Sequence, residues 1–487
     1  MKNLLISLCA IIALVACTES DVDNIGNNSG GQEPPKQPET TLNTPPVNEI
    51  WYTSTDGKIV IPDASTFGSA EIVSNVYENG KGIITFDGEI TAIADYAFYY
   101  KEIQSIAIPN SVTQIGDYAF RECDNLTYIT IPDGVTQIGD HAFDDCDGLT
   151  SITIPDGVTQ ISNCAFVSCG NLTSINIPDG VTQIGDHAFQ GCSSLSSINI
   201  PYGVTQIGDW AFTGCPITSI NIPDGVTQIG DCAFLGCDSL TSITIPNGIT
   251  QIRDRTFEDC RNLISITIPD SVTQIGDFAF EYCRTLTSIT IPDCVTQIGD
   301  YAFEYCDSLT SITIPDGVTQ IGNLAFNHCK NLTSVDIIDG ATQIGHAAFY
   351  DCENLISITI PYGVTQIGYS VFNGCLSLTS IDIPESVTQI MANAFRRCSS
   401  LTTIVIPSSV STIEYGAFYN CNNLHTVDCK AIKPPTLSKG EDGMNAESVF
   451  GYCESLSTIN VPTASVDAYK VADGWKEYKS LIRGKDF

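Results

Sequence analysis

The chain has 487 residues, and its 56 acidic against 21 basic side chains give a formal net charge of −35 at pH 7. Hydrophobic residues make up 43% of the chain, which is enough for a folded core and excludes wholesale disorder. Nucleic-acid binding needs a cationic surface that this composition lacks, so we expect no nucleic-acid partner. Five His and three Trp leave little material for a catalytic centre, and we expect neither an enzyme nor a cofactor.

Residues 1–16 have the pattern of a bacterial signal peptide. A short start containing Lys2 is followed by the apolar run 4–16, which is shorter than the roughly 20 residues of a membrane-spanning helix. The end of this run, residues 14–17, resembles the lipobox of bacterial lipoproteins, in which cleavage precedes a cysteine that receives a diacylglyceryl group. The resemblance implies lipid attachment at Cys17 and contact with the membrane through this anchor only. A plain secretory signal with a chance cysteine is the alternative.

The residues that follow Cys17 predict where the anchored chain faces. The acidic stretch 19–23 resembles a signal that exports lipoproteins to the outer surface of the outer membrane. It implies a lipid-anchored protein of the outer membrane that faces the cell exterior. Residues 17–50 contain Pro, Gly and Asn without a hydrophobic period, which predicts a disordered tether.

From about residue 90 the chain repeats itself with a period of 23 residues. The clearest marker is a phenylalanine that recurs 23 residues apart, with two steps of 22. The fifteen positions are Phe98, Phe120, Phe143, Phe166, Phe189, Phe212, Phe234, Phe257, Phe280, Phe303, Phe326, Phe349, Phe372, Phe395 and Phe418. A fixed period of this length is typical of a solenoid, in which each coil buries its apolar edge against its neighbours.

Within one unit, Leu126, Ile129 and Ile131 follow the inward-facing pattern of a short β-strand. A proline follows in 13 of the 14 units from 109 to 407, and its missing N–H predicts a corner where the strand ends. Asp140 stands where the N-cap of a short helical turn is expected, with Phe143 on the buried face of that turn.

These units, which end in the motif x-Ala-Phe-x-x-Cys, resemble the BspA-like leucine-rich repeats of bacterial surface proteins over residues 90–460. The resemblance implies a repeat solenoid of parallel β coils with short helical turns, about 15 repeats of 23 residues. It divides the chain into an N-terminal cap at 51–89, the leucine-rich-repeat solenoid at 90–428, and an irregular last repeat with a C-terminal cap at 429–487. Within that last part, residues 466–482 read as an amphipathic helix.

The same resemblance implies a function. A cell-surface lipoprotein of this kind acts as a monomeric protein-binding and adhesion module, and its partners are host extracellular-matrix or other cell-surface macromolecules. A surface glycan-binding or capture lipoprotein is the alternative. The family supplies no residue-level binding motif, so binding residues must come from the variation among the units. The residue before Ala-Phe varies from unit to unit and is a large aromatic in several of them, of which we predict four to be binding anchors: Tyr118, Trp210, Phe278 and Tyr301.

The same variable column holds His141, Cys164 and His187 in three successive coils, a set that could share a soft divalent ion. The outer two would be about 10 Å apart in backbone terms and no fourth ligand is evident, so chance occupancy is the alternative. Two ladders of aspartates invite calcium, although a turn Asp and a capping Asp each have a local backbone role.

Two further columns predict structural roles. Fifteen cysteines from Cys123 to Cys453 lie three residues after the phenylalanine, and their side chains would point in parallel, so we expect a buried ladder of free thiols. The pair Thr-Gln occurs in thirteen units from Thr113 to Gln389 and predicts a uniform outer face.

Overall fold

The computed structural model describes residues 44–438 and 448–487, all within the compact unit Leu42–Phe487. The predicted signal peptide, Cys17 and residues 18–43 of the predicted tether lie outside the described residues. Within the described ranges, no helix has both the length and the apolar character needed to cross a bilayer.

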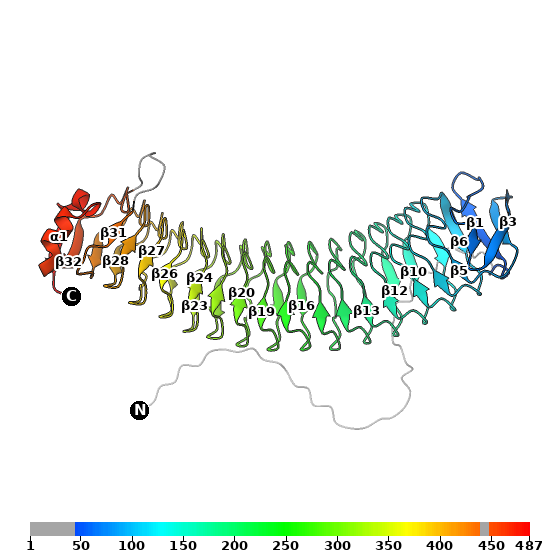
Figure 1. Ribbon diagram of the computed structural model, residues 1–487, viewed down its shortest axis with the longest axis horizontal. Helices are drawn as coiled ribbons and strands as arrows, with labels where there is room; N and C mark the ends of the chain where they lie inside the picture. The colour runs from blue at the N-terminus through cyan, green and yellow to red at the C-terminus, as the bar shows by residue number, and fades with distance from the viewer. Residues whose placement is uncertain (1–43, 439–447) are drawn as a thin grey trace, which may run out of the picture. The chain divides into compact units, whose positions relative to one another are not determined.

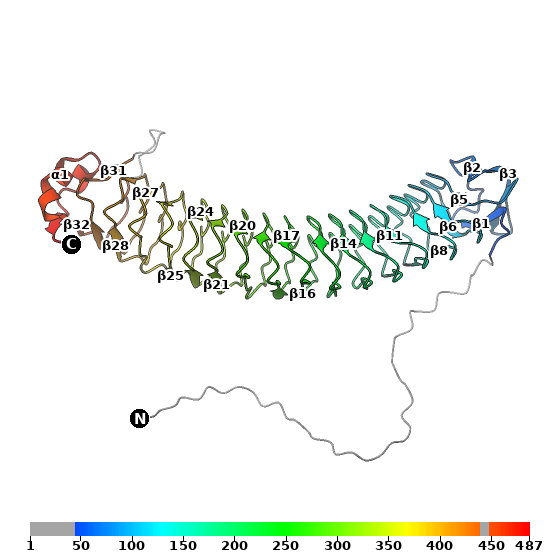
Figure 2. The same cartoon turned by 60° about the horizontal axis from the view of Figure 1, so that its bottom comes forward.

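The repeats form a solenoid in which each coil carries up to two short strands, and the coils lie side by side in chain order along one curved row (Figures 1 and 2). The first strand series, which carries the Leu/Ile pattern, comprises β6 (Ile103–Ala107), β8 (Tyr128–Thr130), β10 (Ser151–Thr153), β12 (Ser174–Asn176), β16 (Ser242–Thr244), β18 (Ser265–Thr267), β21 (Ser311–Ile314), β23 (Ser334–Ile337), β25 (Ser357–Ile358), β28 (Thr403–Ile406), β30 (Thr426–Cys429) and β32 (Thr458–Pro462).

The second series, of two-residue strands, comprises β5 (Ala92–Ile93), β7 (Gln114–Ile115), β9 (Gln137–Ile138), β11 (Gln160–Ile161), β13 (Gln183–Ile184), β14 (Gln206–Ile207), β15 (Gln228–Ile229), β17 (Gln251–Ile252), β19 (Gln274–Ile275), β20 (Gln297–Ile298), β22 (Gln320–Ile321), β24 (Gln343–Ile344), β26 (Gln366–Ile367), β27 (Gln389–Ile390), β29 (Thr412–Ile413) and β31 (Thr436–Leu437).

Wherever strands of successive coils pair, the register is the same, because the period of the sequence equals one coil. In the second series the pairing is interrupted between β9 and β11, between β15 and β17, and between β24 and β26. Gln160 lies opposite Gln183 in a parallel pair, and Gln183 lies opposite Gln206. Equivalent residues of successive units therefore form columns along the rod. The predicted leucine-rich-repeat solenoid of parallel coils is confirmed.

The core is one continuous hydrophobic cluster that runs through all the coils. At its centre the phenylalanine rings stack in an unbroken column from Phe98 to Phe450, with centroids 5.2–5.9 Å apart and planes 2–18° from parallel. These rings are fully buried apart from Phe450, which is 3% exposed. Each ring thus packs chiefly against its two neighbours along the rod.

The segment that carries the phenylalanine is not helical, and the expected short helical turn is wrong. In the unit around Phe143, both His141 and Asp145 have a φ of +56°, in the left-handed region that a right-handed helix excludes. The segment instead consists of linked turns, and equivalent residues repeat this conformation from Tyr96 to Tyr452.

Hydrogen bonds between coils explain this conformation. Every second N–H of the turn donates to a carbonyl of the next coil: His141 to Asn163 at 3.0 Å, Phe143 to Ala165 at 2.9 Å and Asp145 to Val167 at 2.8 Å. In a helix these N–H groups would donate to carbonyls of the same segment, and the carbonyls of the next coil would have no hydrogen-bond partner. Asp140 does not cap its own turn, because its Oδ1 accepts the backbone N–H of Asn163 at 3.0 Å.

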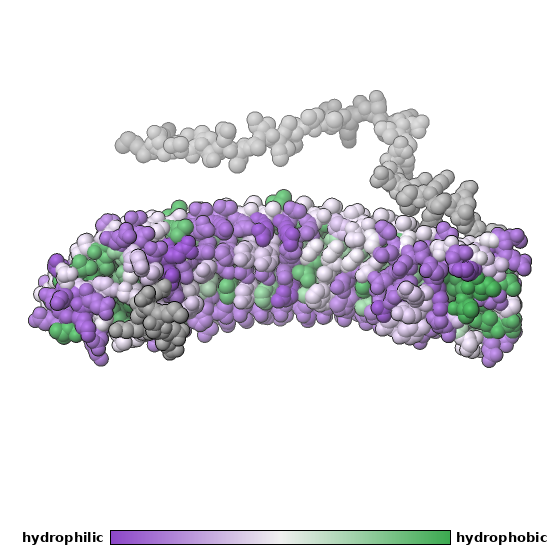
Figure 3. Space-filling model, turned by 90° about the horizontal axis from the view of Figure 1, so that it is seen from above, coloured by the Kyte–Doolittle hydropathy of each residue, from purple (hydrophilic) through white to green (hydrophobic). Residues whose placement is uncertain are grey.

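The N-terminal cap is an antiparallel sheet of β1 (Glu49–Ser54), β3 (Ala70–Glu78) and β4 (Lys81–Phe86), with β2 (Thr66–Phe67) at its edge. Strand β1 pairs with β4 on one side and with β6 of the first coil on the other. The cap starts before residue 51, since the carbonyl of Val47 already accepts the N–H of Ile90. The sequence boundary at 50/51 therefore lies a few residues too late. Figure 3 shows a hydrophobic area over this end of an otherwise largely hydrophilic face.

The C-terminal cap covers the last coil with α1 (Val466–Val471), η1 (Thr463–Ser465), η2 (Trp475–Tyr478) and the parallel strand β33 (Ile482–Lys485). Tyr469 and Trp475 are fully buried. The hydroxyl of Tyr469 donates to the carbonyl of Ala431 at 2.7 Å, and Nε1 of Trp475 donates to that of Pro435 at 2.8 Å. A single helix over 466–482 is therefore wrong: the segment is divided into α1 and η2, which reach these carbonyls, and β33, which begins at Ile482 and pairs with β32.

Candidate interaction surfaces

The four predicted aromatic anchors lie in the turns at three separate places along the rod, and all four are half-buried. Tyr118 stacks on His141 with centroids 4.6 Å apart, and Trp210 stacks on His187 at 5.8 Å. Each ring therefore covers a ring face of the neighbouring coil and leaves its edge toward solvent. Only Phe278 and Tyr301 are brought together, as a stacked pair at 4.6 Å.

The Phe278–Tyr301 pair is part of a larger polar and aromatic cluster. Cζ of Arg255 lies over the Phe278 ring, 4.0 Å from its centroid. Nη1 of Arg255 also forms an ion pair with Oε2 of Glu258 at 2.7 Å. A second stack follows two residues after the core phenylalanines and comprises Tyr282, Tyr305 and His328, with spacings of 4.8 and 4.7 Å.

Buried acidic side chains lie in the column just after the core phenylalanines. Glu281 and Glu304 are each 7% exposed, and Nδ2 of Asn327 donates to Oε1 of Glu304 at 2.5 Å. Burial, together with the negative charge of Glu258 and Glu304, raises the pKa of Glu281 to about 8. Burial also raises the pKa of Glu304. At neutral pH Glu281 is thus mainly protonated, and its carboxyl group donates a hydrogen bond to Glu304.

Sequence reasoning missed this cluster, although a signal was present. The motif Ala-Phe-Glu-Tyr-Cys occurs in two successive units, at 279–283 and 302–306, and in no other unit. A repeated exception to the consensus places like side chains in contact, because equivalent residues face each other across the coils. We define Glu281, Glu304 and Asn327 as the acidic column.

The three predicted metal ligands lie on three successive coils, as expected, and each has its own surroundings. Nδ1 of His141 is 2.8 Å from Oδ2 of Asp144, and Nδ1 of His187 is 2.6 Å from Oε1 of Gln190. Burial and nearby carboxylates raise the pKa of Cys164 to about 11, which disfavours the thiolate that binds metals. In the part of the chain that the structure describes, no group of three His, Cys, Asp or Glu side chains is placed to share a metal ion.

The aspartates that follow the Gln-Ile strands form a ladder between coils. Oδ1 of Asp117 accepts the N–H of Asp140 at 2.9 Å, and Oδ1 of Asp254 accepts that of Asp277 at 2.8 Å. Asn163 replaces an aspartate and makes the same bond. The carboxylates thus have a backbone partner, and an asparagine can substitute for them without any ion.

The cysteines three residues after the core phenylalanines form the expected ladder. Every cysteine in the described ranges is a free thiol, and the column is buried except for the half-buried Cys453. Each Sγ donates to the carbonyl of the phenylalanine in the preceding coil, as Cys260 does to Phe234 at 3.2 Å. Burial raises the pKa of Cys237 to about 12, so its thiol is unreactive at neutral pH, whereas a hydrogen bond with Cys421 lowers the pKa of the half-buried Cys453.

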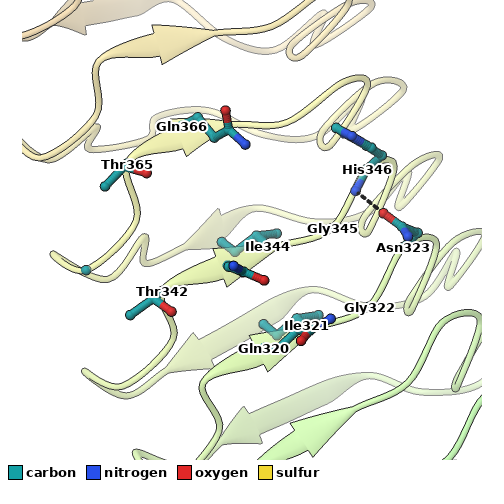
Figure 4. A pocket seen from close by; sticks show the side chains of 12 residues that line it. Gln320, Ile321, Gly322, Asn323, Thr342, Ile344, Gly345, His346, Thr365 and Gln366 are labelled. Carbon is teal, nitrogen blue, oxygen red and sulfur yellow. Dashed lines mark hydrogen bonds between the residues drawn. The ribbon is translucent and has the colours of Figure 1, made fainter.

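A polar pocket of about 510 Å³ opens across three coils on the Thr-Gln face (Figure 4). Its lining contains no carboxylate and no Lys or Arg: Gln320, Ile321, Gly322, Asn323, Thr342, Gln343, Ile344, Gly345, His346, Gly363, Thr365 and Gln366. Asn323 and His346 occupy two positions of the aspartate ladder, and Oδ1 of Asn323 accepts the N–H of His346 at 2.8 Å. We call this hollow the Gln pocket.

A second hollow of about 320 Å³ lies on the other strand face. Ser219–Asp224 and Ser242–Pro246 contribute its lining, and Asp224 gives it a negative charge. It adjoins the unit between Phe212 and Phe234, which is one residue shorter than the period. Only one isolated bridge, between Ser219 and Ser242, joins the two coils in this strand series.

Comparison with known proteins identifies the repeats. The family model described as BspA type leucine rich repeat region (6 copies) matches residues 91–217, 205–333 and 319–437. A leucine-rich repeat protein from Bacteroides ovatus ATCC 8483 is 32% identical, and the match covers 72% of this chain and 88% of that protein, with a TM-score of 0.63.

Two further solved structures are similar in sequence. A leucine rich cell surface protein from Faecalibacterium prausnitzii A2-165 is 31% identical over 82% of this chain and 97% of its own, with a TM-score of 0.40. A leucine-rich repeat protein from Eubacterium ventriosum ATCC 27560 is 27% identical over 66% of this chain and 87% of its own, with a TM-score of 0.45. A comparison with curated proteins finds no match.

Proposed function

The chain belongs to the BspA-type leucine-rich repeat family, and on that premise we propose that it is a cell-surface lipoprotein whose solenoid binds proteins and mediates adhesion. The solenoid fold of this family is consistent with a protein-binding repeat module. The partners would be extracellular-matrix proteins or other macromolecules on the surface of host or neighbouring cells. The protein would act as a monomer and without catalysis.

The observation that carries the proposal is the constancy of the backbone beneath variable side chains. The residue before Ala-Phe has a φ between +53° and +60° in Tyr118, Trp210, Phe278, Tyr301 and Leu324 alike. Different side chains are thus presented at one fixed geometry, one per coil, along the rod. A rigid surface of this kind suits a macromolecular partner, since it needs little ordering on binding.

Charge further restricts the partner. With a net charge of −35, the rod attracts a partner that presents a basic surface, and salt screens this attraction over about 8 Å at physiological ionic strength. We propose a non-catalytic role because the polar side chains of the turns recur as columns, whereas an active site needs one singular constellation.

The proposed location rests on the lipobox-like residues 14–17 and the acidic residues after Cys17. The test is brief protease treatment of intact cells, with a periplasmic protein as the control for leakage. We expect the protein to be cleaved from intact cells, and the Cys17→Ser variant to leave the membrane fraction. Protection from protease in intact cells, with cleavage only after lysis, would contradict a surface location.

The proposed binding activity is tested with the purified full-length protein and a panel of immobilised matrix proteins. We expect saturable binding to at least one basic matrix protein, with a slower association rate as salt is raised from about 50 to 500 mM. Binding that is equal for all proteins, or that is insensitive to salt, would argue against specific recognition by the acidic rod.

A further inference from the structure

We propose that the Gln pocket is a binding site for a neutral oligosaccharide. The inference goes beyond the proposed protein binding and does not depend on it, because the pocket lies on the Thr-Gln face and the aromatic anchors lie in the turns. At about 510 Å³, the pocket falls in the size range of small-ligand sites, roughly 300–1,000 Å³.

The charge of the aspartate ladder changes at the Gln pocket. Carboxylates occupy this column at Asp254, Asp277 and Asp300, and the next coils carry Asn323, His346 and Tyr369. Nδ1 of His346 accepts the N–H of Tyr369 at 3.0 Å, so His346 takes over the acceptor role of the aspartates without their carboxylate, and Nε2 is left as the donor of the ring. The pocket is therefore an uncharged interval on a strongly acidic rod.

The Gln pocket also presents side-chain amides that form no hydrogen bond within the protein. The side-chain amides of Gln320, Gln343 and Gln366 form no hydrogen bond to any other residue in the described ranges, and all three are exposed. Figure 4 shows Gln320 and Gln366 on the outer two of three successive coils, with Thr342 and Thr365 nearby. Gln343 lies opposite Gln320 in the parallel pair of β22 and β24. A column of amides offers both donors and acceptors, which is what the hydroxyl groups of a sugar require.

Two exposed tyrosines adjoin lining residues of the Gln pocket, one through the chain and one through a backbone hydrogen bond. Tyr362 immediately precedes the lining residue Gly363 and is 69% exposed. Tyr369, whose N–H bonds to His346, is 44% exposed. Aromatic rings next to polar groups bind the apolar faces of sugar rings while the polar groups bind their hydroxyls.

Charge excludes the other classes of ligand. An acidic glycan would be repelled by the net charge of −35, and a cationic ligand would prefer the carboxylate ladder of the neighbouring coils, since the pocket lining has no charge. A neutral sugar chain meets no carboxylate and no Lys or Arg in the lining of the pocket.

The chain provides a matched control for the test. The octapeptide Pro-Tyr-Gly-Val-Thr-Gln-Ile-Gly occurs twice, at 201–208 and at 361–368. Tyr202 is 86% exposed. The first octapeptide is followed by Asp209, whereas the second is followed by Tyr369. Tyr202→Ser and Tyr362→Ser therefore make the same change in the same local sequence, and only the second lies at the Gln pocket.

The experiment screens the full-length protein in detergent against neutral oligosaccharides of about four to six units and against uronic-acid and sulfated oligosaccharides. The best neutral binder is then titrated by calorimetry. We expect a dissociation constant below about 1 mM for a neutral oligosaccharide, a loss of about tenfold for Tyr362→Ser and a change of less than about twofold for Tyr202→Ser.

A second variant guards against a purely structural effect. His346→Asp restores the residue that the ladder carries in other coils, so the hydrogen bond to the N–H of residue 369 is kept and the fold is preserved. It removes the Nε2 donor and adds a charge, and we expect at least about a threefold loss of affinity. Absence of any neutral binder, equal binding of acidic oligosaccharides, or equal losses for Tyr202→Ser and Tyr362→Ser would overturn the proposal. Matrix-protein binding that persists in Tyr362→Ser would leave the protein-binding function intact.

Discussion

Oδ1 of Asp277 accepts the backbone N–H of Asp300, one coil farther along the rod, at a distance of 2.7 Å. Asp300 in turn accepts the N–H of Asn323 at 2.6 Å. The carboxylates in this column repel one another, yet each holds a backbone donor that would otherwise lack a partner. The ladder therefore joins adjacent coils, and this role explains why the aspartates recur.

Replacing Asp277 by alanine should weaken the junction between its coil and the next. The lost hydrogen bond is worth about 1 kcal/mol, and we expect faster hydrogen exchange at the amide of residue 300. Asp277→Asn is the control, because Asn163 and Asn323 already fill equivalent positions with the same bond. If hydrogen exchange at residue 300 is accelerated equally in the two variants, the carboxylate acts through its charge and not as a hydrogen-bond acceptor.

Replacing Phe257 by alanine should open a cavity in the ring stack. Phe257 is fully buried between Phe234 and Phe280, at 5.6 and 5.5 Å, and the expected cost is about 3–5 kcal/mol. Since coils contact only their neighbours, hydrogen exchange should rise near residue 257 and stay unchanged in distant coils. A uniform rise from residue 90 to 460 would contradict this locality.

The acidic column should make stability depend on pH. Glu281 faces Glu258 and Glu304, with Arg255 nearby, and its pKa of about 8 in the folded chain lies above the unfolded value of about 4.3. The folded state therefore holds the proton more tightly. The stabilisation is complete below about pH 4 and is lost as pH rises toward 8.

Glu281→Gln should remove this dependence, because the amide stays neutral and can still donate to Glu304. The coils around residue 281 in this variant should exchange more slowly than in the wild type at pH 8, with a smaller difference at pH 5. Exchange rates are compared after correction for the intrinsic effect of pH. An exposed control, Glu454→Gln, should show no such trend; a parallel trend in both variants would refute the assignment.

The cysteine column should be silent toward thiol reagents in the native state. Burial raises the pKa of Cys123 to about 12, whereas Cys294 is exposed. We expect Cys294 and the half-buried Cys453 at the end of the column to react first, and the fully buried cysteines of the column to react only after denaturation. Mass spectrometry that finds most column cysteines in disulfides would contradict the free-thiol ladder.

The aromatic anchors are tested by changing Trp210 and Tyr301 to serine together. If the turns carry protein recognition, binding to the captured matrix protein should fall at least about threefold, or about 0.7 kcal/mol. Both rings also stack on neighbouring coils, so circular dichroism must show an unchanged fold. A smaller loss would place recognition elsewhere, with the face of the first strand series as the next surface to test.

Periodicity predicted the solenoid because one period equals one coil, and every inward residue then follows from the pattern of Leu126, Ile129 and Phe143. The conformation of the turns could not be predicted in the same way. Asp140 before an Ala-Phe pair has the local signature of a helix start, and the hydrogen bonds that exclude a helix come from the next coil, 23 residues away.

In the candidate sites, too, some features follow from the sequence of one unit and others arise only from contacts between coils. Each unit by itself looks ordinary at Glu281 and Glu304, and their perturbed protonation arises only because equivalent positions are stacked and buried. The Thr-Gln pairs predicted a uniform face, and that face is interrupted where Asn323 and His346 replace aspartate. Exceptions to the consensus, compared between adjacent units, are the sequence signal for both sites.

The direction of the hydrogen bonds in the turns gives the rod a polarity. Each turn donates N–H groups toward its C-terminal neighbour, so the first coil is left with bare acceptors and the last with bare donors. The N-terminal cap meets this need, since the N–H of Asp63 donates to the carbonyl of Ala97 at 2.9 Å. Rods stripped of both caps would present complementary ends, and the caps would act as chain terminators against head-to-tail polymerisation.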